Sequence, residues 1–299
     1  MIQIKNISKT FGDVVSLKDV SAEMRDGSIF GLIGSNGSGK STLLRIMCGV
    51  FDGDTGDVMY DGADVWENTR VKEQLVYLSD EQYFTSGGTI SEMRSLYRSV
   101  YPTFSVSRYK HLLELFGLDE KRKVNTFSKG MQRQASVLLG LSCCPKYLFC
   151  DETFDGLDPV MRQLVKRLIA EDVAARGMTV VIASHNLREL EDICDYVGML
   201  HRGELLFVRE LDDIKLGTCK VQAVLPDRPD KDSLRWPGVI SVESQGSLYT
   251  IIARGSEDEV SEKLTPHEPT FVEFIPLTLE EIFISEMEDR GYDYSNVII

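Results

Sequence analysis

Gly34-Ser35-Asn36-Gly37-Ser38-Gly39-Lys40-Ser41 is the stretch that decides the fold of this 299-residue chain. It satisfies the pattern G-x-x-x-x-G-K-[ST] and lies between an apolar run at 28–33, which predicts a buried strand, and a segment at 40–50, which predicts a helix. Glycines let successive backbone N–H groups converge on phosphate oxygens, and the helix start adds its positive end. In such a loop the lysine reaches the β- and γ-phosphates and the hydroxyl of Ser41 holds Mg²⁺. The stretch therefore predicts a site for a nucleoside triphosphate with Mg²⁺.

An acidic pair, Asp151 and Glu152, follows the apolar run at 147–150. Predicted strands at 147–150 and 179–183, with a predicted helix at 159–175 between them, indicate a parallel sheet with crossover helices, hence an α/β fold. Ligands of such sheets bind at the carboxyl ends of the strands, so these carboxylates are expected to face the phosphates. Asp151 is then the partner of Mg²⁺, and Glu152 is a base for the attacking water. Taken alone, the pair could equally be an acidic strand end.

The charge of the chain is uneven. From Cys219 to Ile299 there are 7 basic and 16 acidic residues, which gives −9 of the net charge of −14. An acidic balance argues against a nucleic-acid partner, because phosphate contacts need a basic surface. The acidic tail predicts a separate small α+β unit, with strands at 220–225, 239–243, 247–253 and 271–275 and a helix at 277–287. We therefore expect two domains, 1–215 and 216–299.

The six cysteines have a spacing that fits neither a zinc site nor a paired disulfide framework. The first residues, MIQIKNISKTF, lack the apolar stretch of a signal peptide, and no run approaches the length of a membrane span. We expect a cytoplasmic protein that meets a membrane only through a partner.

Further motifs make the chain resemble an ABC-type ATPase over about residues 1–215. Phe127-Ser128-Lys129-Gly130-Met131-Gln132 resembles the signature sequence of that family, about twenty residues before the acidic pair, although Lys129 and Met131 depart from the commonest residues. Gly156-Leu157-Asp158 matches the segment that bridges two protomers, and Ser184-His185 matches the end of the strand that carries the family's switch histidine. The resemblance implies a P-loop NTPase fold with a RecA-like core, an antiparallel β subdomain and a helical subdomain at about 83–146.

The resemblance also implies roles for particular residues. Two such domains face each other head to tail, so Ser128 and the N–H of Gly130 would contact the γ-phosphate on the opposite protomer. His185 would contact the γ-phosphate, and Phe11 would stack on adenine, although an aromatic residue taken alone is more often part of the core than a cofactor contact. The implied ligands of ATP are Phe11, Ser35, Asn36, Gly37, Ser38, Gly39, Lys40, Ser41, Thr42, Ser128 and Gly130.

Asp80 stands where the family usually has a glutamine that touches Mg²⁺ and the attacking water. A carboxylate can bind Mg²⁺ but adds negative charge beside ATP. We expect Asp80 to join Ser41 and Asp151 as a metal ligand and to assist Glu152 and His185 in hydrolysis, and leave open whether Gln82 substitutes for it.

The resemblance implies the motor subunit of an ABC transporter, bound to a separate membrane permease on the inner face of the cell membrane and to a second ATP-binding protomer. The alternatives are a soluble ABC-type ATPase that acts on ribosomes or DNA, and a P-loop enzyme outside the family, such as a kinase. The Ser-Lys-Gly-Met signature and the ending Leu279-Glu280-Glu281-Ile282-Phe283 resemble the bacterial drug- and antibiotic-exporter branch. A permease surface is expected around 83–98, where Tyr83, Phe84 and Tyr97 could accept a helix or belong to the core.

Overall fold

The computed structural model describes residues 1–211 and 218–281. The chain divides into two compact units, Met1–Val208 and Arg209–Ile299, and each is described by itself. The expected boundary between residues 215 and 216 lies outside the described residues. In the part of the chain that the structure describes, no helix is long and apolar enough to cross a membrane.

A six-stranded sheet forms the centre of the first unit. Its strand order is β10-β9-β3-β8-β7-β6, and β3 pairs in parallel with both β8 and β9, as β7 does with β8 and β6. Every residue of β3, β7 and β8 is buried, as expected of strands covered on both faces. The strand bounds are β3 Ile29–Ile33, β6 Leu75–Leu78, β7 Tyr147–Asp151, β8 Thr179–Ser184, β9 Tyr196–His201 and β10 Glu204–Glu210.

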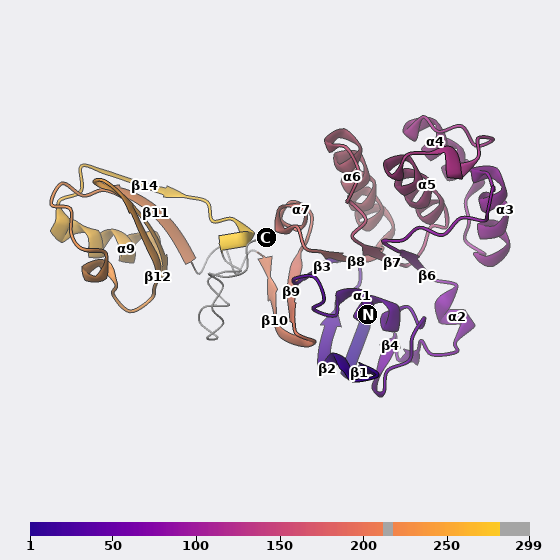
Figure 1. Ribbon diagram of the computed structural model, residues 1–299, viewed down its shortest axis with the longest axis horizontal. Coiled ribbons are helices and arrows are strands. Elements are labelled where there is room, and N and C mark those ends of the chain that lie inside the picture. Colours follow the sequence, from indigo (N-terminus) through magenta and orange to yellow (C-terminus); the bar gives the residue numbers. More distant parts are fainter. Residues whose placement is uncertain (212–217, 282–299) are drawn as a thin grey trace. The chain divides into compact units, whose positions relative to one another are not determined.

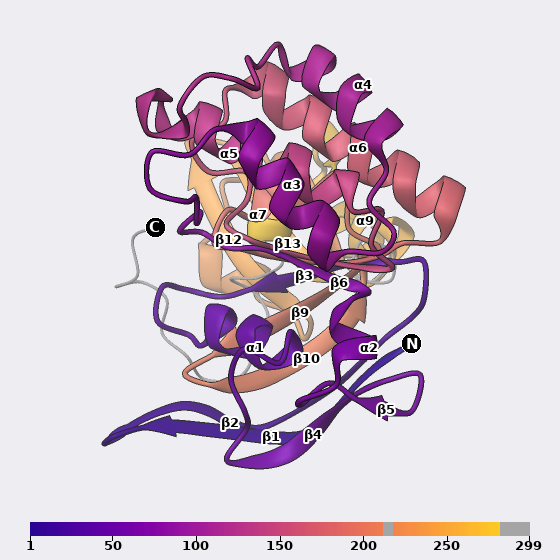
Figure 2. The same ribbon diagram turned by 90° about the vertical axis from the view of Figure 1, so that its right-hand side faces the viewer.

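One face of this sheet carries helix α1 (Lys40–Met47) and, beyond it, an antiparallel sheet of order β2-β1-β4-β5 (Figure 2). Side chains of α1 and both sheets share one apolar core, in which Leu44, Ile4 and Phe149 are buried. The helix expected over 40–50 ends earlier because Gly49 takes a φ of +63°, which stops it. The bounds of the antiparallel strands are β1 Ile2–Phe11, β2 Val14–Met24, β4 Thr55–Tyr60 and β5 Ala63–Asp64.

The longer helices cover the other face (Figure 1). Their ends follow local chemistry: Thr89 and Glu92 form a capping box at the start of α3, Asp158 caps α6 ahead of Pro159, and Gly117 ends α4. The remaining elements of the unit are α2 Thr69–Lys72, α3 Ile90–Val100, α4 Val106–Phe116, η1 Val124–Thr126, α5 Lys129–Ser142, α6 Pro159–Arg176 and α7 Leu187–Glu191. The α/β class and the parallel sheet are confirmed.

The second unit is a four-stranded antiparallel sheet of order β12-β13-β11-β14 with helix α9. One apolar cluster joins the sheet to α9, with Val221, Ile251 and Val260 buried in it. The expected strands are present. Helix α9 was not predicted, although Ser256 and Glu259 form a capping box at its start that is visible in the sequence. The elements are β11 Thr218–Val224, η2 Lys231–Leu234, β12 Val239–Gln245, β13 Leu248–Arg254, α9 Glu257–Leu264, η3 Thr265–His267 and β14 Phe271–Ile275. Of the helix expected at 277–287, residues 282–287 lie outside the described residues.

Candidate functional site

The loop that joins β3 to α1 is tight enough to exclude side chains at two glycines. Gly39, immediately before α1, has a φ of +107°, and a Cβ there would lie 2.5 Å from the carbonyl oxygen of Ser16. A Cβ on Gly34 would lie 2.3 Å from the carbonyl oxygen of Leu200. These two positions therefore require glycine, as expected of a loop whose backbone curls closely enough to bind a phosphate.

Lys40 is held inside this loop. Its Nζ donates to the carbonyl oxygens of Gly34 at 2.7 Å and Ser35 at 3.3 Å, and lies 3.6 Å from Oε1 of Glu152. Burial lowers the pKa of the lysine, and the nearby carboxylate of Glu152 opposes that shift. A buried ammonium group with few water contacts gains from a negatively charged ligand, although the carboxylate of Glu152 already balances part of its charge.

The side chain of Ser38 also indicates that the loop binds a phosphate. Its Oγ is buried and has no hydrogen-bond partner among the described residues. Buried hydroxyls are normally paired, so one left unpaired inside a glycine-rich loop fits a phosphate oxygen as its acceptor. Thr42, the last residue of the loop, instead has a partner within the chain, since its Oγ1 accepts from Ser16 Oγ at 2.9 Å.

Ser41 and Asp151 meet at the end of β7. The hydroxyl of Ser41 donates to Oδ1 of the fully buried Asp151 at 3.0 Å, and the hydroxyl of Tyr77, on β6, donates to Oδ2 at 2.7 Å. A hydroxyl and a carboxylate side by side are hard oxygen donors of the kind that Mg²⁺ prefers. These two residues therefore fit the metal that the loop predicts, with Tyr77 fixing the second oxygen of the carboxylate.

Glu152 and His185 lie at the ends of the neighbouring strands β7 and β8. Nδ1 of His185 lies 3.0 Å from Oε2 of Glu152, and the backbone N–H of His185 donates to the same oxygen at 3.3 Å. Glu152 has a φ of +46°, an uncommon conformation for a residue with a side chain. The structure thus gathers Lys40, Ser41, Asp151, Glu152 and His185 at the carboxyl ends of parallel strands.

Ser128 and Gly130 lie at the start of α5, and the structure does not join them to the loop. Ser128 is exposed and caps α5, its Oγ accepting from the N–H of Met131 at 3.2 Å. A Cβ on Gly130 would lie 2.7 Å from the carbonyl oxygen of Gly156. Within the described residues, no hydrogen bond connects Ser128 or Gly130 to residues 34–42. Their proposed contact with a nucleotide on another protomer stays a prediction.

Phe11 and Asp80 lie in different surroundings. Phe11 is 44% exposed; its ring meets that of Phe51 edge-on, with 5.5 Å between centroids, and Nζ of Lys9 lies over it at 5.6 Å from the centroid. Its expected stacking on adenine stays a prediction. Asp80 is paired with Arg133 of α5, whose Nη2 lies 2.9 Å from Oδ1 of Asp80. In the described part of the chain, no hydrogen bond or ion pair joins Asp80 to Ser41 or Asp151, and its expected role as a metal ligand stays a prediction.

Sequence analysis missed Tyr77 and Arg133. Tyr77 sits in an apolar strand, where tyrosine is an ordinary core residue, and only the pairing of β6 with β7 in the folded sheet brings it beside Asp151. Arg133 is one of several basic residues in a helical region, and nothing in its spacing separates it from a solvent-exposed arginine.

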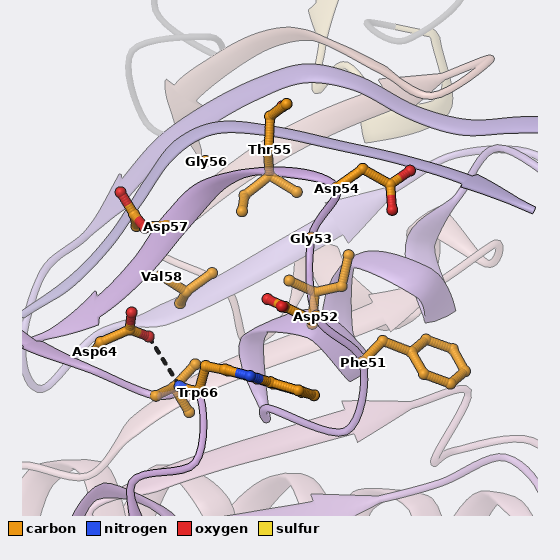
Figure 3. Close-up of a pocket in the computed structure, with 13 residues that line it drawn as sticks. Phe51, Asp52, Gly53, Asp54, Thr55, Gly56, Asp57, Val58, Asp64 and Trp66 are labelled. Atoms are coloured by element: carbon orange, nitrogen blue, oxygen red, sulfur yellow. Dashed lines mark hydrogen bonds between the residues drawn. The ribbon is translucent and has the colours of Figure 1, made fainter.

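A separate pocket of about 360 Å³ opens in the antiparallel sheet (Figure 3). Four aspartates line it, together with Phe51 and Trp66: Asp52, Asp54, Asp57 and Asp64. Asp64 accepts a hydrogen bond from the N–H of Trp66, and Asp54 is paired with Lys9 at 2.7 Å. Because four carboxylates in one pocket would repel a triphosphate, this pocket is not the nucleotide site.

Comparison with known proteins points to one family. The family model described as ABC transporter matches residues 17–155. The ABC transporter ATP-binding protein YtrB of Bacillus subtilis is 31% identical over 286 residues, 96% of this chain and 98% of that protein. The lantibiotic transport ATP-binding protein SrtF of Streptococcus pyogenes is 29% identical over 71% of this chain and 92% of its own length. The methionine import ATP-binding protein MetN of Clostridium acetobutylicum is 30% identical, covering 85% of this chain and 84% of that protein.

Solved structures show the same fold. An ATP-binding subunit of an ABC transporter superposes with a TM-score of 0.67 at 26% identity, over 72% of this chain and 92% of that one. The dimeric ATP-binding cassette MJ0796 bound to ADP and Pi superposes with a TM-score of 0.64 at 21% identity, over 71% of this chain and 99% of that one. The expected P-loop NTPase fold is confirmed. By its sequence, its fold and its site, the chain belongs to the ABC transporter family and is an ATP-binding subunit with ATPase activity.

Proposed function

We propose that this chain is the ATP-hydrolysing motor of an exporter and acts through a separate membrane permease. The observation that carries the proposal is the arrangement of side chains at the ends of β7 and β8. Ser41 donates a hydrogen bond to Asp151 there. Glu152 lies between Lys40 on one side and His185 on the other. This arrangement supplies a phosphate-binding cation, oxygen ligands for a metal and a base, which are the parts that phosphoryl transfer to water needs.

Each side chain has a distinct task in this proposal. Lys40 binds the β- and γ-phosphates, while the N–H groups of the loop bind the other phosphate oxygens. Glu152 accepts the proton of the attacking water, and His185 orients Glu152 through its Nδ1 contact. Mg²⁺, held by Ser41 and Asp151 when bound, neutralises charge on the phosphates.

A second ATP-binding protomer is part of the proposal. Ser128 is exposed at the N-terminal end of the 14-residue helix α5, where the helix dipole favours an anion. The N–H of Gly130 lies in the first turn of the same helix. Because no hydrogen bond among residues 1–211 and 218–281 connects these groups to the loop at 34–42, we propose that they complete the nucleotide site of the partner protomer. ATP would then hold two protomers together, and hydrolysis would release them.

The permease contact is proposed on the segment that follows β6. Tyr83 is 77% exposed, and Leu96 and Val100 on α3 are 44% and 52% exposed, which supports a surface for an apolar helix. Tyr97 is half-buried and its ring lies 5.8 Å from that of Tyr101, and this burial raises its pKa to about 12. Tyr83 is therefore the better candidate for a contact, and Tyr97 for a core residue. Such a contact would place the chain on the inner face of the cell membrane.

Export is favoured over import by the signature and by the ending at 279–283, and similarity to SrtF, named for lantibiotic transport, supports it. Similarity to MetN, named for methionine import, supports an importer as the second candidate.

Affinity capture tests the proposal. The Glu152→Gln variant, with ATP, is purified from detergent-solubilised membranes, and the co-purifying proteins are identified by mass spectrometry. We expect a polytopic membrane protein. Tyr83→Asp added to Glu152→Gln should abolish its capture, whereas Tyr83→Asp alone, with Glu152 intact, should leave ATP hydrolysis by the isolated chain unchanged. Transport in vesicles with the captured permease then gives the direction of movement. Ribosomal proteins in place of a membrane protein would contradict a transport role.

A further inference from the structure

Arg133 fastens the loop that follows β6 to helix α5. Its Nη1 donates to the carbonyl oxygen of Ser79 at 3.0 Å, and its Nη2 donates to Oδ1 of Asp80 at 2.9 Å. The side chain of Arg133 is only 8% exposed, whereas that of Asp80 is 57% exposed. Since a guanidinium that has lost most of its water needs its partners, these two contacts fix the loop more firmly than an exposed ion pair would.

The same face of α5 is held against β6 further along. Gly140 follows Arg133 by seven residues, which is about two helical turns and returns to the same face. A Cβ on Gly140 would lie 2.7 Å from Cδ2 of Leu78 and 3.1 Å from Cγ1 of Val76. Close packing at one end and the Arg133 contacts at the other join β6, its following loop and α5 into one block.

Helix α5 also carries the groups proposed to meet the nucleotide of the partner protomer. Ser128 caps the helix five residues before Arg133, and Gly130 lies in its first turn. Arg133 therefore links the loop at Ser79 and Asp80 to the helix whose first turn holds Gly130.

We propose that Asp80 is a positioning residue and not a ligand of Mg²⁺. Paired with Arg133, it orients α5 so that Ser128 and Gly130 reach the nucleotide on the second protomer. The pair also solves the charge problem of an acid at this position, because the guanidinium balances a carboxylate that would otherwise repel ATP. This inference rests on the proposed two-protomer site.

The test uses the full chain with the Glu152→Gln substitution, which is expected to slow hydrolysis and retain the ATP-bound dimer. Three variants are added to it: Asp80→Asn, Arg133→Gln and the double variant. Asp80→Asn is nearly isosteric at an exposed position, so it keeps the test valid if Arg133→Gln fails to fold. The matched control is Glu171→Ala, which breaks an exposed ion pair with Arg167 on α6.

Two measurements separate the roles. Sedimentation gives the dissociation constant of the dimer formed with ATP and Mg²⁺, and hydrogen exchange reports opening at the Met131 amide at the start of α5. We expect Asp80→Asn and Arg133→Gln each to weaken the dimer about tenfold and to speed exchange at Met131, with the double variant little worse than either. The affinity of the monomer for ATP, and its dependence on Mg²⁺, should stay unchanged, as should every property of the Glu171→Ala control.

Contrary results are equally specific. If Asp80→Asn alters the Mg²⁺ dependence of ATP binding while Arg133→Gln does not, Asp80 is a metal ligand and the inference is wrong. Unchanged exchange at Met131 in both single variants would also overturn it. If the Glu152→Gln parent stays monomeric with ATP, a site formed by two copies of this chain is excluded and the second protomer must be a different chain, whereas the exchange measurement still decides whether the Asp80–Arg133 pair holds α5.

Discussion

Replacing Tyr77 with phenylalanine removes one hydroxyl from the wall of the candidate site and leaves the ring in place. That hydroxyl donates to Oδ2 of Asp151 at 2.7 Å, and Asp151 is completely buried, so water cannot replace the lost donor. Burial raises the pKa of Tyr77, which keeps the hydroxyl protonated and able to donate at neutral pH. A hydrogen bond to a charged group contributes about 1.5–3 kcal/mol, so the free energy of unfolding should fall by about that amount.

Tyr147→Phe is a matched control in the same unit. Its hydroxyl also donates to an aspartate, Oδ2 of Asp61 at 3.0 Å, but the side chain of Asp61 is 50% exposed and is bound by Lys146 and the N-terminus as well. Water and those cations replace the lost donor, and the loss should stay below about 1 kcal/mol.

Urea denaturation of the full chain without nucleotide measures both losses. The account predicts a clearly larger loss for Tyr77→Phe, together with a higher Mg²⁺ concentration for half-maximal ATP binding, since Asp151 is then less well oriented. Equal losses in the two variants, or a larger one for Tyr147→Phe, would show that the burial of Asp151 does not determine the strength of this hydrogen bond.

Three further predictions concern the backbone of the loop at 34–42, the contact with the adenine base of ATP, and the dependence of stability on pH. Gly39→Ala should lower the free energy of unfolding by at least about 1–3 kcal/mol and abolish nucleotide binding. The reason is that Gly39 has a φ of +107° and that an added Cβ would lie 2.5 Å from the carbonyl oxygen of Ser16. Calorimetry measures the stability, and titration with ATP measures the binding. Phe11→Ala should weaken ATP binding by roughly threefold to tenfold without changing the maximal rate of hydrolysis, since a stacking contact contributes about 0.5–1.5 kcal/mol. An unchanged affinity for ATP would assign Phe11 to the core alone. The hydrogen bond from Lys146, and a second from the N-terminus, hold the pKa of Asp61 below its ordinary value. The stability from this group is therefore present above about pH 4 and lost as the pH falls further, so the unfolding free energy of Asp61→Asn should decline less steeply in acid.

The sequence predicts the parts of the site that lie close together along the chain. The loop at 34–42 and the pair Asp151 and Glu152 each consist of adjacent residues with one chemical task, and the apolar strands before them fix where they lie in a parallel sheet. For that reason, the contact between Ser41 and Asp151 follows from the predicted order of strands and loops.

Contacts between distant segments were beyond prediction from the sequence. Tyr77 meets Asp151 through the pairing of β6 with β7, and Arg133 meets Asp80 where α5 packs against β6, as it does closely at Gly140. Each of these side chains has an ordinary role in its local sequence, as a strand tyrosine or a helix arginine. The early end of α1 was missed because the apolar pattern continues into Val50, whereas the positive φ of Gly49 is a property of the backbone.

Release of phosphate from ATP measures directly whether the acids at the end of β7 carry out hydrolysis. The wild-type chain is compared with the double variant Asp151→Asn/Glu152→Gln, which keeps the size of both side chains and removes both negative charges. If Asp151 and Glu152 carry out hydrolysis as the geometry at the ends of β7 and β8 indicates, release by the double variant falls to background, at least about a hundredfold below wild type. Release at the wild-type rate would contradict the assignment of this site.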